Sequence, residues 1–281
     1  MNAEEQARAD IVEVGRRLWH RGFVASNDGN ISVRLDDNRL VTTPKSVSKG
    51  FMTPDMMVIT DLDGKKITGE RDPSSELKMH LEVYRNRPDA RAVVHAHPPT
   101  ATGFAVAGIP LDRAVLAEVI TTLGSIPIAE YATPSTQELP NAVRKYVKAH
   151  DGLLLANHGA LAIAGDVMSA YYRMETIEHF AKISLVAHTL GRENLLSRDE
   201  VERLQGLRGM YGIASPAPIC ADDSAAASGG QLECQVIQAP DSDARVVPHA
   251  VPMPPTGMDG EIRLTYRELT ALIEDALRAL K

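Results

Sequence analysis

The sequence predicts a mixed α/β domain over residues 1–213, and three observations support this. Short apolar segments of strand length alternate with segments whose apolar residues recur every three or four positions, as they do in helices. Turn signals such as Asn27-Asp28-Gly29-Asn30 separate these segments. Hydrophobic residues make up 44% of the 281 positions, which is enough to fill a sizeable core, so a globular enzyme fits.

The predicted elements follow one another along the chain. Helical periodicity indicates helices at 3–21, from 74 or 75 to a point before Pro88, at 100–107, at 166–190 and at 197–207. Apolar and alternating segments indicate strands at 31–35, 40–42 and 57–60. Two further apolar strands, at 91–97 and 153–158, both end in histidine.

Charge and composition exclude several classes of partner. The formal net charge is −7 and no long basic block accompanies it, so we expect no nucleic-acid or anionic-membrane binding. The sequence has no long apolar run, and its start, MNAEEQARAD, lacks the features of a signal peptide, so we expect a soluble, cytoplasmic protein. Cys220 and Cys234 are the two cysteines, and we expect unpaired thiols in a linker rather than a disulfide framework.

The composition changes after residue 213. Residues 214–260 hold seven prolines and four glycines without periodicity, which indicates a flexible linker spanning on the order of 40 Å. Residues 261–281 predict an amphipathic helix that begins at a capping box of Thr265 and Glu268. Such a short helix needs a surface to pack on. The helix either packs on its own domain or a neighbouring subunit, or binds a separate partner protein. The length of the linker favours the separate partner.

Three histidines form the clearest chemical pattern in the sequence. His95 and His97 are two positions apart on a predicted strand, so their side chains point to one face at a separation that suits two ligands of one metal. His158 ends the second apolar strand, where a third imidazole can converge. Three histidines with an open position are typical of catalytic zinc. The alternative is a set of strand-end histidines that bond to water or backbone.

Glu76 follows two hydroxyl residues at the start of a predicted helix. The free backbone N–H groups and the positive end of the dipole attract anions there. One interpretation is a carboxylate that stabilises the first turn. The other is a catalytic carboxylate beside a phosphate site, because Ser74 and Ser75 suit phosphate and the histidines follow about twenty positions later.

Together these segments resemble the class II aldolase/adducin family. The resemblance runs in order over roughly residues 7–213 and rests on Gly29-Asn30-Ile31-Ser32, Thr43-Pro44, Pro73-Ser74-Ser75-Glu76, Val94-His95-Ala96-His97, Tyr131-Ala132-Thr133 and Asn157-His158-Gly159. It implies a three-layer α/β/α sandwich with a central, mostly antiparallel sheet. It also implies a homotetramer with active sites between subunits.

The resemblance further implies roles for individual residues. His95, His97 and His158 would hold one Zn²⁺ per subunit, Glu76 would be the acid/base, and Tyr211 would donate a proton. The residues expected at the substrate phosphate are Gly29, Asn30, Thr43, Lys45, Ser74 and Ser75. Lys45 and Ser46 follow Thr43-Pro44, where the family's loop usually has a glycine soon after.

The reaction implied by the resemblance is cleavage of a ketose 1-phosphate. A (deoxy)ketose 1-phosphate such as L-fuculose or L-rhamnulose 1-phosphate would yield dihydroxyacetone phosphate and an aldehyde, lactaldehyde. One alternative is a pentulose-5-phosphate 4-epimerase of the same family, and another is an inactive adducin-like scaffold. The tail is similar to encapsulation peptides, which implies a microcompartment shell protein as a partner of residues 261–281 and a location inside a bacterial microcompartment.

Overall fold

The computed structural model describes residues 2–213 and residue 219. Its α-helices are α1 (Ala3–His20), α2 (Leu77–Asn86), α3 (Pro99–Ala107), α4 (Ala117–Thr122), α5 (Glu138–Val147), α6 (Val167–Thr189) and α7 (Arg198–Leu207). Three short 3₁₀ helices are η1 (Lys49–Phe51), η2 (Pro54–Met56) and η3 (Arg208–Tyr211). The strands are β1 (Asn30–Arg34), β2 (Arg39–Thr42), β3 (Val58–Asp61), β4 (Lys66–Thr68), β5 (Ala92–Ala96), β6 (Ile128–Ala129), β7 (Gly152–Leu155) and β8 (Gly159–Ala164).

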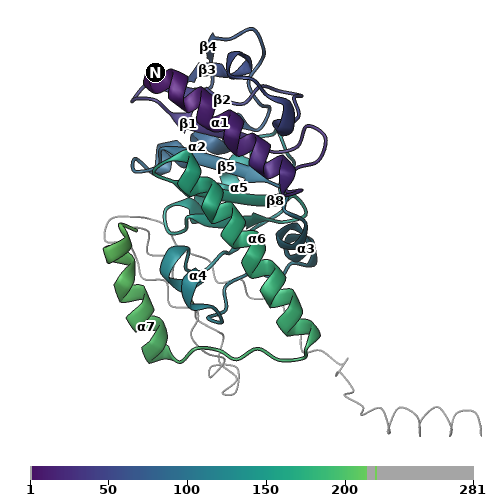
Figure 1. The fold of residues 1–281 in the computed structure, drawn as a ribbon, viewed down its shortest axis with the longest axis vertical. Helices are drawn as coiled ribbons and strands as arrows, with labels where there is room; N and C mark the ends of the chain where they lie inside the picture. The colour runs from purple at the N-terminus through teal and green to yellow at the C-terminus, as the bar shows by residue number, and fades with distance from the viewer. Residues whose placement is uncertain (1, 214–218, 220–281) are drawn as a thin grey trace, which may run out of the picture. The chain divides into compact units, whose positions relative to one another are not determined.

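All eight strands join in one sheet, in the order β4-β3-β2-β1-β5-β8-β7-β6 (Figure 1). Every neighbouring pair is antiparallel except β6 and β7, which run parallel. At the centre, β5 lies between β1 and β8, with His95 opposite Asn30 on one side and opposite Leu161 on the other. The expected mostly antiparallel sheet is therefore confirmed.

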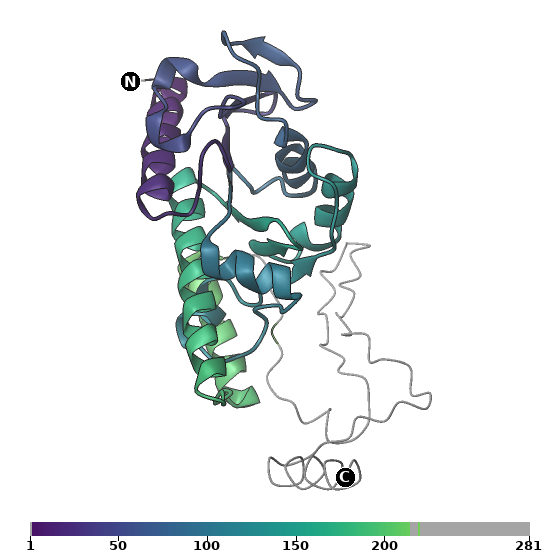
Figure 2. The same ribbon diagram turned by 90° about the vertical axis from the view of Figure 1, so that its right-hand side faces the viewer.

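Helices cover both faces of this sheet. Figure 2 shows α1 in purple and α6 in green on one side, and the blue α2 and green-teal α5 on the other. Alternate side chains of the strands point to opposite faces. Val94 of β5 accordingly packs with the α1, α3 and α6 cluster, whereas Val93 packs with α2 and α5. The expected three-layer sandwich is confirmed.

Within residues 2–213 the expected helices and strands are present, and most of their ends shift by one or two residues. The two strands expected to end in histidine stop earlier, β5 at Ala96 and β7 at Leu155, so His97 and His158 lie just beyond them. The start of α2 shifts too, because this helix begins at Leu77 rather than at residue 74 or 75. Ser74 N–H donates to the carbonyl of Thr43, and Leu77 N–H donates to Ser74, so these residues form a turn that joins α2 to the end of β2. Glu76 is consequently the N-cap residue of α2.

Two α-helices, α4 and α5, three strands, β4, β6 and β8, and the three short 3₁₀ helices were not expected from the sequence. All six residues of β8 are buried, because helices cover both of its faces, and such a strand shows no polar alternation. In α5, Pro140 interrupts the helical pattern but stands in the first turn, where its missing N–H leaves no helical bond unmade.

The predicted linker at 214–260 and the predicted helix at 261–281 lie outside the described residues, apart from Ile219. Both remain predictions, as do the unpaired thiols of Cys220 and Cys234. Within residues 2–213, no helix is long and apolar enough to cross a membrane.

Candidate metal centre and active site

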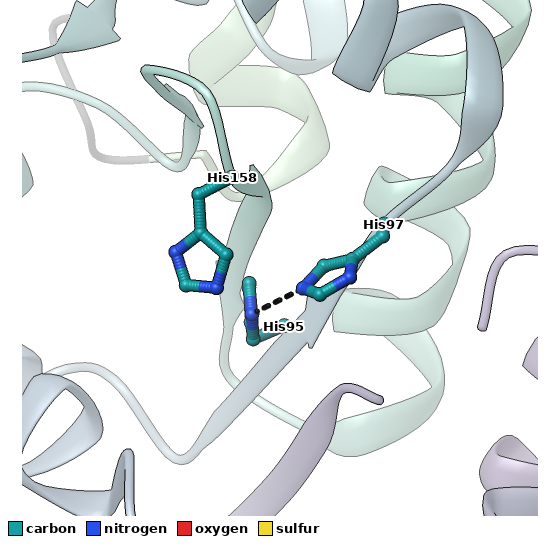
Figure 3. Close-up of side chains that lie close together, drawn as sticks. All are labelled: His95, His97 and His158. Atoms are coloured by element: carbon teal, nitrogen blue, oxygen red, sulfur yellow. Dashed lines mark hydrogen bonds between the residues drawn. The ribbon is translucent and has the colours of Figure 1, made fainter. Parts of the chain in front are cut away.

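The strand order brings the three predicted histidines together at one end of the sheet. His95 lies on β5, His97 follows that strand directly, and His158 lies in the turn between β7 and β8. Their ligand nitrogens all lie within 4.8 Å of one another. Figure 3 shows the three rings pointing toward one another, with His95 Nε2 and His97 Nε2 3.1 Å apart.

Gly159 makes this convergence possible. A Cβ atom at this position would lie 2.6 Å from both the carbonyl oxygen of Ala96 and Cδ2 of His97. Any larger residue would push the start of β8 away from the end of β5. The glycine that follows His158 therefore allows the turn to approach the other two histidines.

The donor set fits a metal ion. His95 Nδ1 lies 2.9 Å from the carbonyl of Ala160, and His97 Nδ1 lies 3.4 Å from a carboxylate oxygen of Asp28. Both oxygens can only accept, so each favours the proton on Nδ1 and leaves Nε2 as a lone pair. Burial lowers the pKa of His95 well below its usual value, which keeps the ring neutral. Two such lone pairs 3.1 Å apart favour a cation between them.

Glu76 faces the same point from the N-terminus of α2. Its Oε1 lies 3.2 Å from His158 Nε2, and its Oε2 lies 3.5 Å from His95 Nε2. Asn30 holds the carboxylate there by donating from Nδ2 to Oε2 at 2.8 Å. Burial raises the pKa of the Glu76 carboxyl, but hydrogen bonds from His158 and Asn30 act in the opposite direction, and the pKa lies below its usual range. A carboxylate thus stands beside the histidines in its charged form.

A cavity of about 270 Å³ opens in front of these side chains. Glu76, His97 and His158 line it, and so do five of the six residues expected at the phosphate, namely Gly29, Asn30, Lys45, Ser74 and Ser75. Buried Asn30 Oδ1 has no hydrogen-bond partner among the described residues, so it can accept a bond from a substrate hydroxyl.

Three predicted site residues do not line this cavity, namely the fully buried His95 of the metal candidates, Thr43 and Tyr211. Thr43 is buried, its Oγ1 accepts the N–H of Ile31, and its carbonyl accepts the N–H of Ser74. It therefore positions the loop rather than facing the cavity. Tyr211 lies on η3 with 67% of its surface exposed, outside the lining of the cavity in this single chain.

The structure adds cavity residues that sequence reasoning did not single out. Asp28, Ser46, Lys49 and Ser135 all line the cavity. Ser46 has a φ of 59°, which is the left-handed conformation that glycine adopts most readily, and it follows Thr43-Pro44 where the family's loop usually has glycine. The sequence around Asp28 predicted a turn, but nothing in it predicted that the Asp28 carboxylate would lie next to His97.

Comparison with known proteins agrees with the fold and the site. The model of the class II aldolase and adducin N-terminal domain matches residues 9–185. The chain is 36% identical over 202 residues to the 5-deoxy-D-ribulose 1-phosphate aldolase of Bacillus thuringiensis. This match covers 71% of this chain and 94% of that protein. It is 30% identical over 210 residues to a 3-oxo-tetronate 4-phosphate decarboxylase of Pectobacterium atrosepticum. This match covers 73% of this chain and 94% of that protein.

A solved structure of L-fuculose 1-phosphate aldolase matches with a TM-score of 0.68 and 32% identity, covering 72% of this chain and 95% of that one. The chain therefore belongs to the class II aldolase and adducin family. At the level of enzyme class, it is a metal-dependent aldolase, a lyase. The relatives carry different substrate names, so the family alone leaves the substrate open.

Proposed function

We propose that this protein is a zinc-dependent aldolase that cleaves a (deoxy)ketose 1-phosphate to dihydroxyacetone phosphate and an aldehyde. One observation carries the proposal, namely that the three histidines, the Glu76 carboxylate and the anion-binding candidates line or adjoin a single cavity. L-fuculose and L-rhamnulose 1-phosphates, which would yield lactaldehyde, are the first candidates. The 5-deoxy-D-ribulose 1-phosphate in the name of a relative is of the same chemical type.

In this proposal His95, His97 and His158 hold the metal. When bound, Zn²⁺ would supply Lewis-acid polarisation of the substrate's ketone and adjacent hydroxyl. Ala160 and Asp28 support the arrangement, since their oxygens accept from the outer nitrogens of His95 and His97.

Glu76 then moves the proton at the reacting carbon. In the condensation direction the charged carboxylate removes a proton from the carbon next to the ketone. In the cleavage direction the electron pair of the broken carbon–carbon bond stays on that carbon, and the protonated Glu76 returns the proton to it. The hydroxyl that becomes the aldehyde releases its own proton in the same step, and through solvent this proton replaces the one that Glu76 gives. Asn30 orients the carboxylate for both steps. The hydroxyls and backbone of Ser74 and Ser75, next to the start of α2, hold the phosphate.

Tyr211 enters the proposal as a proton donor supplied by a second copy of the chain. Its exposed position on η3 leaves it accessible to a neighbouring subunit. The proposed assembly is a homotetramer. This agrees with the exposed apolar residues along α6 and at its C-cap, namely Tyr172, Leu185, Val186 and Leu190. Light scattering of the purified full chain measures the assembly directly, and a monomer would contradict it.

The decisive assay is a panel of ketose 1-phosphates with measurement of dihydroxyacetone phosphate release. We expect release from at least one deoxyketose 1-phosphate, and a loss of about 10² to 10⁴ in kcat for Glu76→Gln. Glu76→Gln should retain its metal, because the histidines remain. No triose phosphate from any member of the panel would overturn the aldolase proposal.

A second candidate reaction is decarboxylation of 3-oxo-tetronate 4-phosphate. The 30% identity to an enzyme of that name favours it. The same histidines and carboxylate would serve, since both reactions break a bond next to a carbonyl carbon. Release of carbon dioxide from that substrate, without triose phosphate from the ketoses, would select this function.

The proposed partner of residues 261–281 is a microcompartment shell protein, and this proposal rests on the sequence pattern alone. Deleting these residues should leave aldolase activity intact and abolish co-purification with a shell protein. Co-purification that survives the deletion would refute the partner role.

A further inference from the structure

We infer that Lys49 binds the phosphate of the substrate and supplies the buried positive charge of the site. This inference rests on the proposed sugar-phosphate function. Lys49 begins η1 and lines the cavity together with Asn30, Ser74 and Ser75. Lys45, the lysine singled out from the sequence, is exposed, whereas Lys49 is only 2% exposed.

The hydrogen bonds of Lys49 leave it one donor. Its Nζ donates to the carbonyl of Asn27 at 2.9 Å and to the carbonyl of Val47 at 2.7 Å. An ammonium group has three donors, and the third finds no acceptor among the described residues. An anion in the cavity would accept the third hydrogen bond of the ammonium group. Charge-assisted hydrogen bonds from ammonium to phosphate are among the strong hydrogen bonds in proteins.

The backbone around Lys49 is seated firmly on α1. A Cβ atom at Gly15 would lie 2.7 Å from the carbonyl oxygen of Lys49, and one at Gly50 would lie 2.5 Å from the ring of Trp19. Two glycines therefore allow η1 to lie directly against the helix. This packing fixes the backbone from which the Lys49 side chain reaches the cavity.

The electrostatics favour an anionic ligand. Burial lowers the pKa of Lys49 to about 8, while Asp28 and Glu76 act in the opposite direction. No carboxylate among the described residues lies within 4.0 Å of its Nζ, so the charge is buried with neutral carbonyl partners alone. Burying an ammonium in this way destabilises a fold, and a bound anion offsets that loss.

Phosphate is the anion that fits the rest of the cavity. The Ser74 and Ser75 hydroxyls, and the backbone next to the N-terminus of α2, supply further donors. The Asn27 and Val47 carbonyls belong to the two loops that border the cavity, so Lys49 also ties those loops to each other. The site thereby combines one fixed cation with neutral donors.

The test measures phosphate binding without turnover. Isothermal titration of inorganic phosphate into the metal-replete full chain compares the wild type with Lys49→Met, Lys49→Arg and the control Lys78→Met, an exposed residue of α2 outside the cavity lining. We expect Lys49→Met to weaken phosphate binding about 10- to 100-fold, Lys49→Arg to weaken it less, and Lys78→Met to match the wild type. KM for the sugar phosphate should rise more than kcat falls.

Thermal unfolding separates binding from a structural role. We expect the Tm of Lys49→Met to stay close to the wild-type value, because removing a desolvated charge is offset by leaving the carbonyls of Asn27 and Val47 without their donor. Unchanged phosphate affinity in Lys49→Met would overturn the role of Lys49. A loss of affinity that is equal in Lys49→Met and Lys49→Arg, together with a lower Tm in both variants, would also overturn it, because it would indicate a structural role only. A wild type that binds no phosphate and releases no triose phosphate would instead overturn the proposed function itself.

Discussion

Asn30 Nδ2 donates to Glu76 Oε2 at 2.8 Å, and this bond joins the first residue of β1 to the N-cap of α2. The carboxylate is thereby turned toward His95 and His158, which lie 3.5 and 3.2 Å from its oxygens. Two elements 46 residues apart in sequence thus set the direction of one side chain.

Replacing Asn30 should lower turnover while leaving metal binding intact. The Asn30→Ala variant loses a hydrogen bond to a charged group, and such bonds contribute about 1.5 to 3 kcal/mol, so kcat should fall about 10- to 100-fold. Steady-state kinetics and elemental analysis measure the two effects. Asn38→Ala, in the exposed turn before β2, is the control. Equal kcat in Asn30→Ala and wild type would contradict the positioning role.

Metal content should depend on the histidine cluster alone. We expect His97→Asn to lose stoichiometric zinc on purification, because two imidazoles then remain of the three that converge. His179→Asn, at an exposed position of α6, should retain it. Elemental analysis by mass spectrometry after dialysis gives the comparison. A full zinc content in His97→Asn would exclude this cluster as the metal site.

Gly159 should tolerate no side chain. The Cβ of Gly159→Ala would lie 2.6 Å from the Ala96 carbonyl oxygen, so β8 must move and carry His158 with it. We expect a destabilisation of about 1 to 3 kcal/mol, together with weaker metal binding. Gly165→Ala is the matched control, because nothing lies within 4 Å of its added carbon. Urea unfolding and metal titration should separate the two variants, and equal values for both would refute the crowding argument.

His80 should make the protein sensitive to acid. It is fully buried on α2, its Nδ1 lies 2.7 Å from Ser32 Oγ, and burial lowers its pKa from 6.5 to about 3. Below pH 6.5 the unfolded chain binds a proton that the folded chain does not bind until about pH 3. The free energy of unfolding should therefore fall by roughly 1 kcal/mol per pH unit across that window.

The His80→Asn variant keeps a side chain able to bond Ser32 but does not titrate. Urea unfolding of the metal-free proteins at pH values from 7 to 4 should give a flatter pH dependence for His80→Asn than for the wild type. His179→Asn controls for the loss of an exposed histidine. Parallel curves for His80→Asn and the wild type would show that His80 does not cause the acid sensitivity.

Local patterns in the sequence predict the mixed α/β domain and the metal candidates, whereas the three layers were implied by the family resemblance. His95 and His97 stand at strand spacing, and an apolar segment leads to His158, so their convergence follows once both segments are strands. The same patterns do not predict β8, whose six buried residues carry no alternation. Contacts such as that between Asp28 and His97, 3.4 Å apart, depend on the packing of separate loops and leave no local signal.

The sequence also does not show that Lys49, rather than Lys45, is the buried lysine of the cavity. In the sequence, Lys45 and Lys49 are equivalent lysines of one loop, and Lys45 lies nearer to the Thr43-Pro44 signal. Their burial differs because η1 packs on α1 through Gly15, a contact across more than thirty positions. Long-range packing of this kind decides which lysine enters the cavity.

The pairing of β5 with β8 ties the metal site to the correct assembly of the sheet. His95 stands opposite Leu161 and Ala96 opposite Ala160, and a shift of one residue would turn the His95 ring to the opposite face. Chains with the wrong register would then lack His95 as a ligand. A metal bound by the three histidines would therefore favour the correctly paired chains, and it would stabilise them by RT ln(1 + [metal]/Kd).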